Sequence, residues 1–190
     1  SSAPDMRNSL SAANERELEL LRQIALHDRA AFRELYLAYH RRLARFLMRM
    51  TFRHDVIEEV INDALWTVWR KAAEFRGESQ VSTWIVGIAY RCALKALRAA
   101  PSARTIHLEQ SPTSEDMQAL AENRQWLDRA LAELPFEQRM VLELSYLLGH
   151  SCEEIAAIMQ CPVNTVKTRM FHAREKMRSS LPRLAGLEKS

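Results

Sequence analysis

Glycine and proline are scarce in this chain, with 4 glycines and 6 prolines among 190 residues. Both residues interrupt helices and mark turns, so their scarcity favours long helices over a fold built from many tight turns. No stretch alternates apolar and polar residues in the sustained way that a half-buried strand requires. Together these absences predict an all-α protein.

Cysteine is equally rare. Cys92, Cys152 and Cys161 form no CxxC pair and cannot all be joined in disulfides. A disulfide framework is therefore not expected, and a reducing compartment, the cytoplasm, is the predicted location. The spacing of Cys152 and Cys161, even together with His150, matches no zinc pattern, so no metal site is expected.

Long apolar runs and catalytic motifs are also missing. No run approaches the roughly 20 residues of a membrane-spanning helix, and no signal-peptide pattern is recognised, so membrane insertion is not expected. The sequence contains no glycine-rich phosphate loop and no HExxH motif, and its 6 histidines are scattered. We therefore expect neither an enzyme nor a cofactor or small-molecule substrate.

The charges are separated along the chain although the net charge is only +3. Residues 41–53 hold five arginines and no acid, residues 55–63 hold four acids and no base, and residues 167–183 hold six basic residues and one acid. Separate blocks of opposite sign indicate different partners for different surfaces.

Apolar periodicity predicts two helical domains. In the first, helices are expected at about 15–26, from Asp28 to Leu37 or beyond, and at 39–50, 55–75 and 81–99. Asp28 is the expected N-cap of the second helix, and Ser82 or Thr83 that of the last. The expected inner stripe of the first helix is Leu18, Leu21 and Ala25, and that of the fourth is Val56, Ile57, Val60, Ile61, Ala64, Leu65, Val68 and Ala72.

The composition changes at residues 101–116, PSARTIHLEQSPTSED, which are polar, contain two prolines and show no sustained apolar periodicity. This composition indicates a flexible linker. The domains are thus predicted at residues 15–100 and 117–185. In the second, helices are expected at about 117–133, 136–147, 152–159 and 164–180.

The stretch SCEEIAAIMQCPVNTVKTRMFHARE predicts a helix-turn-helix. Ser151 and Glu154 have the spacing of a capping box, QCPV is a four-residue break, and Asn164 is the expected cap of the second helix. Ala156 and Ala157 are small enough for two helices to approach closely. An ordinary helical hairpin is the alternative.

The second of these helices has two different faces. Its apolar stripe is Val166, Met170, Ala173 and Met177, and its outer face carries Asn164, Lys167, Thr168, Phe171 and His172, flanked by Arg169 and Arg174. Lys167 is suited to guanine acceptors, Thr168 and Phe171 to a thymine methyl group, and the two arginines to phosphates. The outer face thus predicts reading of DNA in the major groove, with a solvated basic helix as the alternative.

Taken together, the two halves resemble a bacterial extracytoplasmic-function (ECF) sigma factor of the sigma-70 family. In the first half the resemblance is carried by DRAAFRELYLAYHRRLARFL, DVIEEVINDALWTVWRKAAEFRGES and STWIVGIAYRCALKALR. In the second half it is carried by ALAELPFEQRMVLELSYLLGHSCEEIAAIMQCPVNTVKTRMFHARE. The resemblance implies a σ2-like and a σ4-like domain that bind the β′ and β subunits of core RNA polymerase and recognise the −10 and −35 elements of promoter DNA.

The resemblance also implies roles for three sets of residues. Glu58, Glu59, Asn62 and Asp63 would dock on a basic coiled coil of the β′ subunit, the alternative being a solvated acidic face. The break at Arg76, Gly77, Glu78 and Ser79 would take up a base flipped from the −10 strand. Tyr90 would stack on a base, while Arg91, Lys95 and Arg98 would hold the single-stranded backbone.

Three positions depart from the family pattern. Gly87 stands where a basic residue is frequent, Arg91 where asparagine is frequent, and Gln160 where a turn glycine is frequent. If position 160 needs a positive φ, glutamine there costs stability. Family resemblance also implies a controlling anti-sigma factor. A stand-alone helix-turn-helix regulator, which would bind duplex DNA tightly without polymerase, is the second hypothesis.

Overall fold

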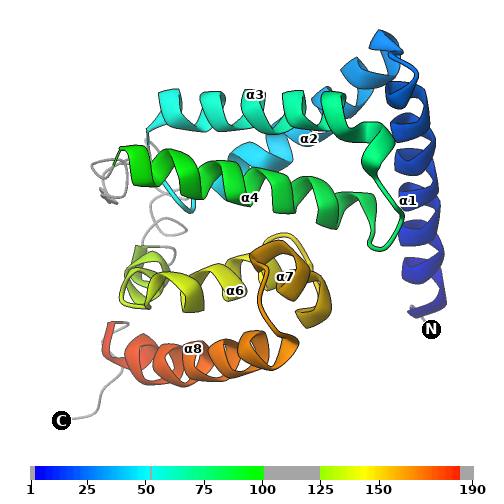
Figure 1. Ribbon diagram of the computed structural model, residues 1–190. Helices are drawn as coiled ribbons and strands as arrows, with labels where there is room; N and C mark the ends of the chain where they lie inside the picture. Colours follow the sequence, from blue (N-terminus) through cyan, green and yellow to red (C-terminus); the bar gives the residue numbers. More distant parts are fainter. Residues whose placement is uncertain (1–2, 52, 101–124, 185–190) are drawn as a thin grey trace, which may run out of the picture. The chain divides into compact units, whose positions relative to one another are not determined.

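The computed structural model describes residues 3–51, 53–100 and 125–184, and within them every regular element is a helix, as predicted. The expected linker at 101–116 lies outside the described residues. Residues 125–132 are helical. The other elements, shown in Figure 1, are α1 (Ala3–Ala25), α2 (Arg29–Leu47), α3 (His54–Lys71), the 3-10 turn η1 (Ala72–Glu74), α4 (Val81–Ala99), α6 (Phe136–Tyr146), α7 (Cys152–Met159) and α8 (Val163–Leu184).

The chain divides into two compact units, and the first contains α1 to α4. Its most extensive helix contact joins α3 to α4, and α2 packs on both α1 and α3. The predicted inner stripe of α3 is buried at every position, because apolar residues three and four apart share one side of a helix. The largest fully buried side chains of this unit include Ile24, Leu35, Tyr39, Phe46, Ile61, Leu65, Ile85 and Leu97.

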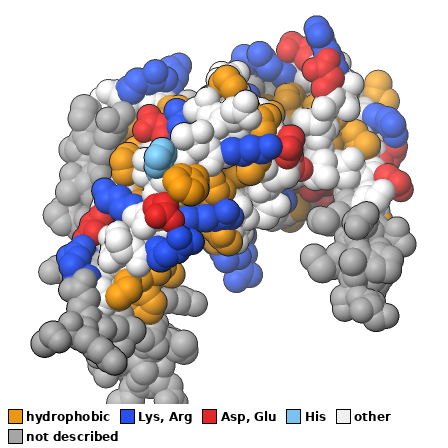
Figure 2. Space-filling view, turned by 90° about the horizontal axis from the view of Figure 1, so that it is seen from below, with side chains coloured by type: hydrophobic (Ala, Val, Ile, Leu, Met, Phe, Trp, Pro, Cys, Tyr) orange, Lys and Arg blue, Asp and Glu red, His pale blue; other side chains and the backbone are white. Residues whose placement is uncertain are grey.

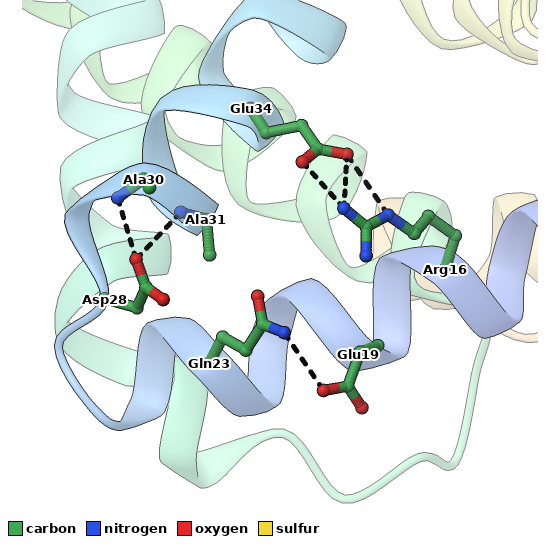
Figure 3. A network of polar contacts seen from close by, with 7 residues as sticks. All are labelled: Arg16, Glu19, Gln23, Asp28, Ala30, Ala31 and Glu34. Carbon is green, nitrogen blue, oxygen red and sulfur yellow. Dashed lines mark hydrogen bonds and ion pairs between the residues drawn. The ribbon is translucent and has the colours of Figure 1, made fainter.

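Polar contacts fix α1 against α2. Asp28 caps α2 as predicted, since its side chain accepts hydrogen bonds from the backbone N–H groups of Ala30 and Ala31. Arg16 of α1 donates to both carboxylate oxygens of Glu34 on α2, with the shortest distance, from Nη2 to Oε2, at 2.7 Å (Figure 3). Both side chains are about half exposed, so this ion pair links the two helices but contributes little to the free energy of unfolding.

Several predictions for the first unit are wrong in detail. The first helix begins at Ala3 rather than near residue 15. Among residues 11–25 of this helix the buried positions are Leu20, Leu21 and Ile24, whereas Leu18 and Ala25 are half-buried. The helix expected from Asp28 to Leu37 or beyond and the periodic run at 39–50 together form one helix, α2, which ends at Leu47. The helix α2 is continuous because no glycine or proline interrupts residues 29–47.

The predicted cap of α4 is also wrong. The N-cap residue is Gln80, whose side chain makes no capping hydrogen bond, and Ser82 and Thr83 lie inside the helix with 8% and 3% of their surfaces exposed. Instead, the backbone N–H of Val81 donates to Oδ1 of Asn14 on α1 over 3.1 Å. Because this acceptor lies sixty-seven residues away in the sequence, no residue near the start of α4 indicates it.

The second unit contains residues 125–132, α6, most of α7, and α8. Helices α6 and α8 make its main contact. The core includes Met140, Val141, Leu144, Ile155, Val166 and Ala173. The C-terminal half of α8 is held by Glu133, whose carboxylate accepts from Ser180 and Arg183 and whose backbone carbonyl accepts from Lys176.

Candidate functional site

The outer side of α3 carries the predicted acidic face, which comprises Glu58, Glu59, Asn62 and Asp63. All four side chains are exposed, because the buried stripe occupies the opposite side of the helix. Helix α2 borders this face: the hydroxyl of Tyr36 donates to Oδ1 of Asn62 over 3.2 Å, and Nε2 of His40 lies 3.1 Å from Oε2 of Glu58. The structure thus presents the four residues together on one solvent-facing surface.

Trp66 extends the acidic face and was missed by the sequence reasoning. It lies three residues after Asp63 and four after Asn62 on the same side of α3, and 56% of its surface is exposed. The other apolar residues of α3 are buried, apart from the half-buried Trp69, so a tryptophan exposed to this degree makes Trp66 a candidate contact residue. The available signal was its helical register, since residues 59, 62, 63 and 66 are three and four apart.

The connection at residues 75–80 joins η1 to α4 and holds four predicted site residues. Arg76, Gly77 and Glu78 are exposed, and Ser79 is half-buried. Gly77 adopts φ 72°, and a Cβ added there would contact nothing within 4 Å, so the requirement for glycine is conformational and not spatial. The ring centroids of Phe75, at the start of the loop, and Trp84, within the first turn of α4, lie 5.2 Å apart.

The predicted DNA-contacting residues of α4 differ in accessibility. Lys95 and Arg98 are exposed, Arg91 is half-buried, and only 4% of the surface of Tyr90 is exposed. Burial lowers the pKa of the Arg91 guanidinium, which still carries its charge at neutral pH. Stacking of a base on the Tyr90 ring therefore requires that ring to become accessible.

Arg91 lies close to Gly87, one turn earlier on α4. A Cβ added at Gly87 would lie 3.3 Å from Nη1 and 3.5 Å from Nη2 of Arg91. The guanidinium thus occupies the space next to the helix that a side chain at position 87 would take. The two departures from the family pattern at these positions are sterically coupled.

The helix-turn-helix begins with the predicted capping box. The backbone N–H of Glu154 donates to Oγ of Ser151 over 3.2 Å, and Oε2 of Glu154 accepts from the backbone N–H of Ser151 over 2.7 Å. Helix α7 ends at Met159, and Gln160 has φ 54°, which is the positive φ considered for this position. The backbone N–H of Cys161 closes the turn by donating to the carbonyl of Ala156.

The break between the two helices is shorter than predicted. Helix α8 already begins at Val163, so Asn164 lies within its first turn and the prediction that it caps the helix is wrong. The carbonyl of Pro162 accepts from the N–H groups of Thr165 and Val166 and so starts the helix. Proline fits this place because its missing N–H would have no partner in a first turn.

The outer face of α8 holds the predicted DNA-reading residues. Asn164, Lys167, Thr168, Phe171, His172 and Arg174 are exposed, and Arg169 is half-buried. The stripe Val166, Met170 and Ala173 is buried as predicted, while Met177 is half-buried. The face drawn in Figure 2 shows Lys and Arg side chains set among hydrophobic ones.

Phe171 is the most exposed aromatic residue of this face, with 62% of its surface accessible. Its ring meets that of His172 edge-on at 5.5 Å. Next to the face lies Tyr146 of α6, which is 69% exposed and was missed by the sequence reasoning. Its hydroxyl accepts from Nη2 of Arg174 over 3.1 Å, and the guanidinium lies 5.9 Å from its ring centroid. Arg174 is thereby oriented by a residue from another helix.

The basic residues of α8 fall into two groups. Toward the C-terminus, Lys176 and Arg183 bind Glu133 and so hold α8 to the rest of the unit, while Arg178 pairs with Glu175 one turn earlier on α8. Toward the N-terminus, no ion pair within the described ranges engages Lys167, and Nη1 of Arg169 contacts the sulfur of Cys161 at 3.8 Å. The cations available for a ligand therefore lie at the N-terminal end of α8.

Within residues 3–51, 53–100 and 125–184, no three His, Cys, Asp or Glu side chains are grouped so that they could hold a metal ion. In the same ranges, none of the helices has both the length and the apolar character needed to cross a membrane.

Comparisons with known proteins agree with this arrangement. Residues 35–102 match the family "Sigma-70 region 2", and residues 124–177 match "Sigma-70, region 4". The ECF RNA polymerase sigma-E factor of Escherichia coli strain K12 is 33% identical over 171 residues, covering 82% of this chain and 89% of the relative. The factor of the same name from Haemophilus influenzae is 31% identical over 177 residues, covering 85% and 93%.

Two solved structures have a similar fold. CnrH, in complex with the cytosolic domain of CnrY, has a TM-score of 0.65 at 21% identity and covers 86% of this chain and 96% of its own. The sigma factor RpoE from Bartonella quintana, in complex with the anti-sigma factor NepR, has a TM-score of 0.57 at 24% identity and covers 83% and 98%. With two region matches in order and curated relatives aligned over most of both lengths, the chain belongs to the ECF sigma factors of the sigma-70 family.

Proposed function

We propose that this protein binds core RNA polymerase and directs it to a specific set of promoters, with residues 15–100 serving the polymerase and the −10 element and residues 117–185 the −35 element. Residues 101–116 would link the two. The observation that carries the proposal is the presence of both sigma-70 regions in one chain, each with an exposed surface of suitable chemistry. Acting on polymerase places the protein in the cytoplasm, and its role is binding rather than catalysis.

Recognition of the −35 element is assigned to the N-terminal half of α8. A buried stripe anchors this helix, so its exposed face can enter the major groove without unfolding the unit. Lys167 can donate to guanine, Thr168 and Phe171 can meet a thymine methyl group, and Asn164 and His172 add polar contacts. Arg169 and Arg174 would hold phosphates, with Arg174 oriented by Tyr146.

Recognition of the −10 element is assigned to the loop at 75–80 and the outer side of α4. The exposed loop residues Arg76, Gly77 and Glu78, with Ser79, would receive the flipped base. Arg91, Lys95 and Arg98 would follow the backbone of the single strand, and Tyr90 would stack on a base once its ring is accessible.

Docking on polymerase is assigned to the acidic face together with Trp66. Glu58, Glu59 and Asp63 supply negative charge, Asn62 supplies an amide, and Trp66 supplies an exposed apolar ring beside them. A basic helical surface, as expected for the β′ coiled coil, complements this combination. Such docking would steer the encounter through charge and hold the complex through the tryptophan.

Control by an anti-sigma factor is part of the proposal. The similar structure from Bartonella quintana is described as a complex with the anti-sigma factor NepR. A protein of the same fold and family is suited to a partner of the same kind, which would cover polymerase-binding surfaces until released.

Run-off transcription with bacterial core RNA polymerase on a promoter library tests the function. Transcripts from a defined subset of promoters, absent without the protein, are expected and would yield both DNA motifs. Absence of transcripts, together with tight binding of duplex DNA by the protein alone, would favour the stand-alone regulator.

Alanine variants of the reading face test the assignment to α8. Lys167→Ala and Phe171→Ala are expected to lower transcription from −35-dependent promoters while leaving affinity for core polymerase unchanged. Arg178→Ala is the matched control, because Arg178 is an exposed cation of the same helix that pairs with Glu175. Normal transcription from every promoter by the first two variants would show that the reading face is wrongly assigned.

A further inference from the structure

The start of α4 lacks a cap of its own. Gln80 contributes no side-chain hydrogen bond, and the first turn of the helix contains no acidic residue. Val81, Ser82 and Thr83 are 0%, 8% and 3% exposed, so water does not readily reach the unpaired N–H groups of this turn. A buried helix start of this kind needs an acceptor from elsewhere in the protein.

Asn14 of α1 supplies that acceptor. Its Oδ1 lies 3.1 Å from the backbone nitrogen of Val81, at the point where the loop at 75–80 becomes helix. Helix α1 also packs on η1, which immediately precedes the same loop. Figure 1 shows the connection between α3 and α4 lying beside α1. One helix therefore holds both ends of the loop, while Arg76, Gly77 and Glu78 between them are exposed.

We propose that Asn14 is a positioning residue for −10 recognition: by fixing the first amide of α4, it holds the loop at 75–80 in the shape that receives an extruded promoter base. The inference rests on the proposed function of that loop. Capturing a flipped base requires a preformed pocket, because unpairing the base already costs free energy. Gly77 restricts the loop backbone less than any other residue would, so the conformation of the loop depends on the contacts at its two ends.

The test compares holoenzymes made with the full-length wild-type protein, Asn14→Ala and Asn14→Asp. Open-complex formation is measured on a promoter identified by run-off transcription and on the same promoter with its −10 element substituted. Asn14→Ala leaves a buried N–H without an acceptor, and we expect about tenfold less open complex on the intact promoter. On the substituted promoter the loss should be small, so discrimination between the two templates falls.

Asn14→Asp is the rescue variant. A carboxylate retains the acceptor oxygen and suits the positive end of a helix, so it should restore discrimination. Arg16→Ala is the matched control on α1, because it removes the exposed pair with Glu34 without touching the loop. It should leave discrimination unchanged.

Two results would overturn the proposal. One is an equal loss on both templates with Asn14→Ala, which is the mark of a general loss of stability. The other is a failure of Asn14→Asp to restore discrimination. If the wild-type holoenzyme itself does not discriminate between the templates, the assigned role of the loop fails, and that outcome is visible before any variant is compared.

Discussion

Replacing Trp66 with alanine should weaken binding to core RNA polymerase without harming the fold. A tryptophan offers up to about 250 Å² of surface, and 56% exposure leaves roughly 140 Å² that a partner can cover. At about 25 cal/mol per Å², complete coverage would contribute roughly 3.5 kcal/mol. Because coverage is incomplete and ordering the side chain has a cost, we expect a loss of about 1–3 kcal/mol, or roughly 5- to 150-fold in affinity.

The assay is a fluorescence or calorimetric titration of core polymerase with wild-type protein and two variants. Phe171→Ala is the reciprocal control, because Phe171 is similarly exposed, at 62%, but belongs to the DNA-reading face of the other unit. Trp66→Ala should lose polymerase affinity and keep binding to −35 duplex DNA, and Phe171→Ala should do the reverse. If Trp66→Ala binds core polymerase as tightly as wild type, the tryptophan is not part of the docking surface.

Three further predictions follow from the same contacts. The double variant Glu59→Lys with Asp63→Lys should bind core polymerase more weakly than wild type at low salt, and this difference in affinity should shrink as salt screens the charges. Unchanged affinity would contradict docking through the acidic face. An unchanged melting temperature of the variant would exclude misfolding. Gln160→Gly should raise the free energy of unfolding by about 0.5–1 kcal/mol in urea, because glycine relieves a left-handed conformation but loses more entropy on folding; a destabilised variant would show that the glutamine side chain matters in the turn. Hydrogen bonds from Arg183 and then Ser180 lower the pKa of the Glu133 carboxyl in the folded protein. The charged carboxylate should therefore contribute its full stability well above the ordinary glutamate pKa of about 4.3, and this contribution should disappear as the pH falls below that value. Melting curves of wild type and Glu133→Gln should therefore differ near pH 7 and converge as the pH falls through the lowered pKa of the folded protein, and a pH-independent difference would refute the ionic contribution.

Local chemistry made much of the fold predictable. The buried stripe of α3 follows from apolar residues three and four apart, and the capping box at Ser151 and Glu154 needs only residues within one turn. The cap at Asp28 is equally local. Helix caps were predicted wrongly where the stabilising group is remote, as at Val81, or where a proline carbonyl replaced the expected side chain, as before Val163.

The candidate surfaces divide in the same way. The outer face of α8 and the acidic face of α3 were predictable, because a helix with one apolar stripe must expose its other side. Trp66 and Tyr146 were missed, since a large apolar residue is usually buried and sequence alone does not say which one is left uncovered.

By itself, the sequence determined the helical class, the positions of most helices and which side of each amphipathic helix faces solvent. These properties depend on interactions between residues a few positions apart. Only the tertiary structure decided that Asn14 caps α4, that Tyr146 orients Arg174, and that the guanidinium of Arg91 lies over Gly87. Each of these contacts depends on side-chain geometry or on how helices pack, and helical periodicity does not specify either.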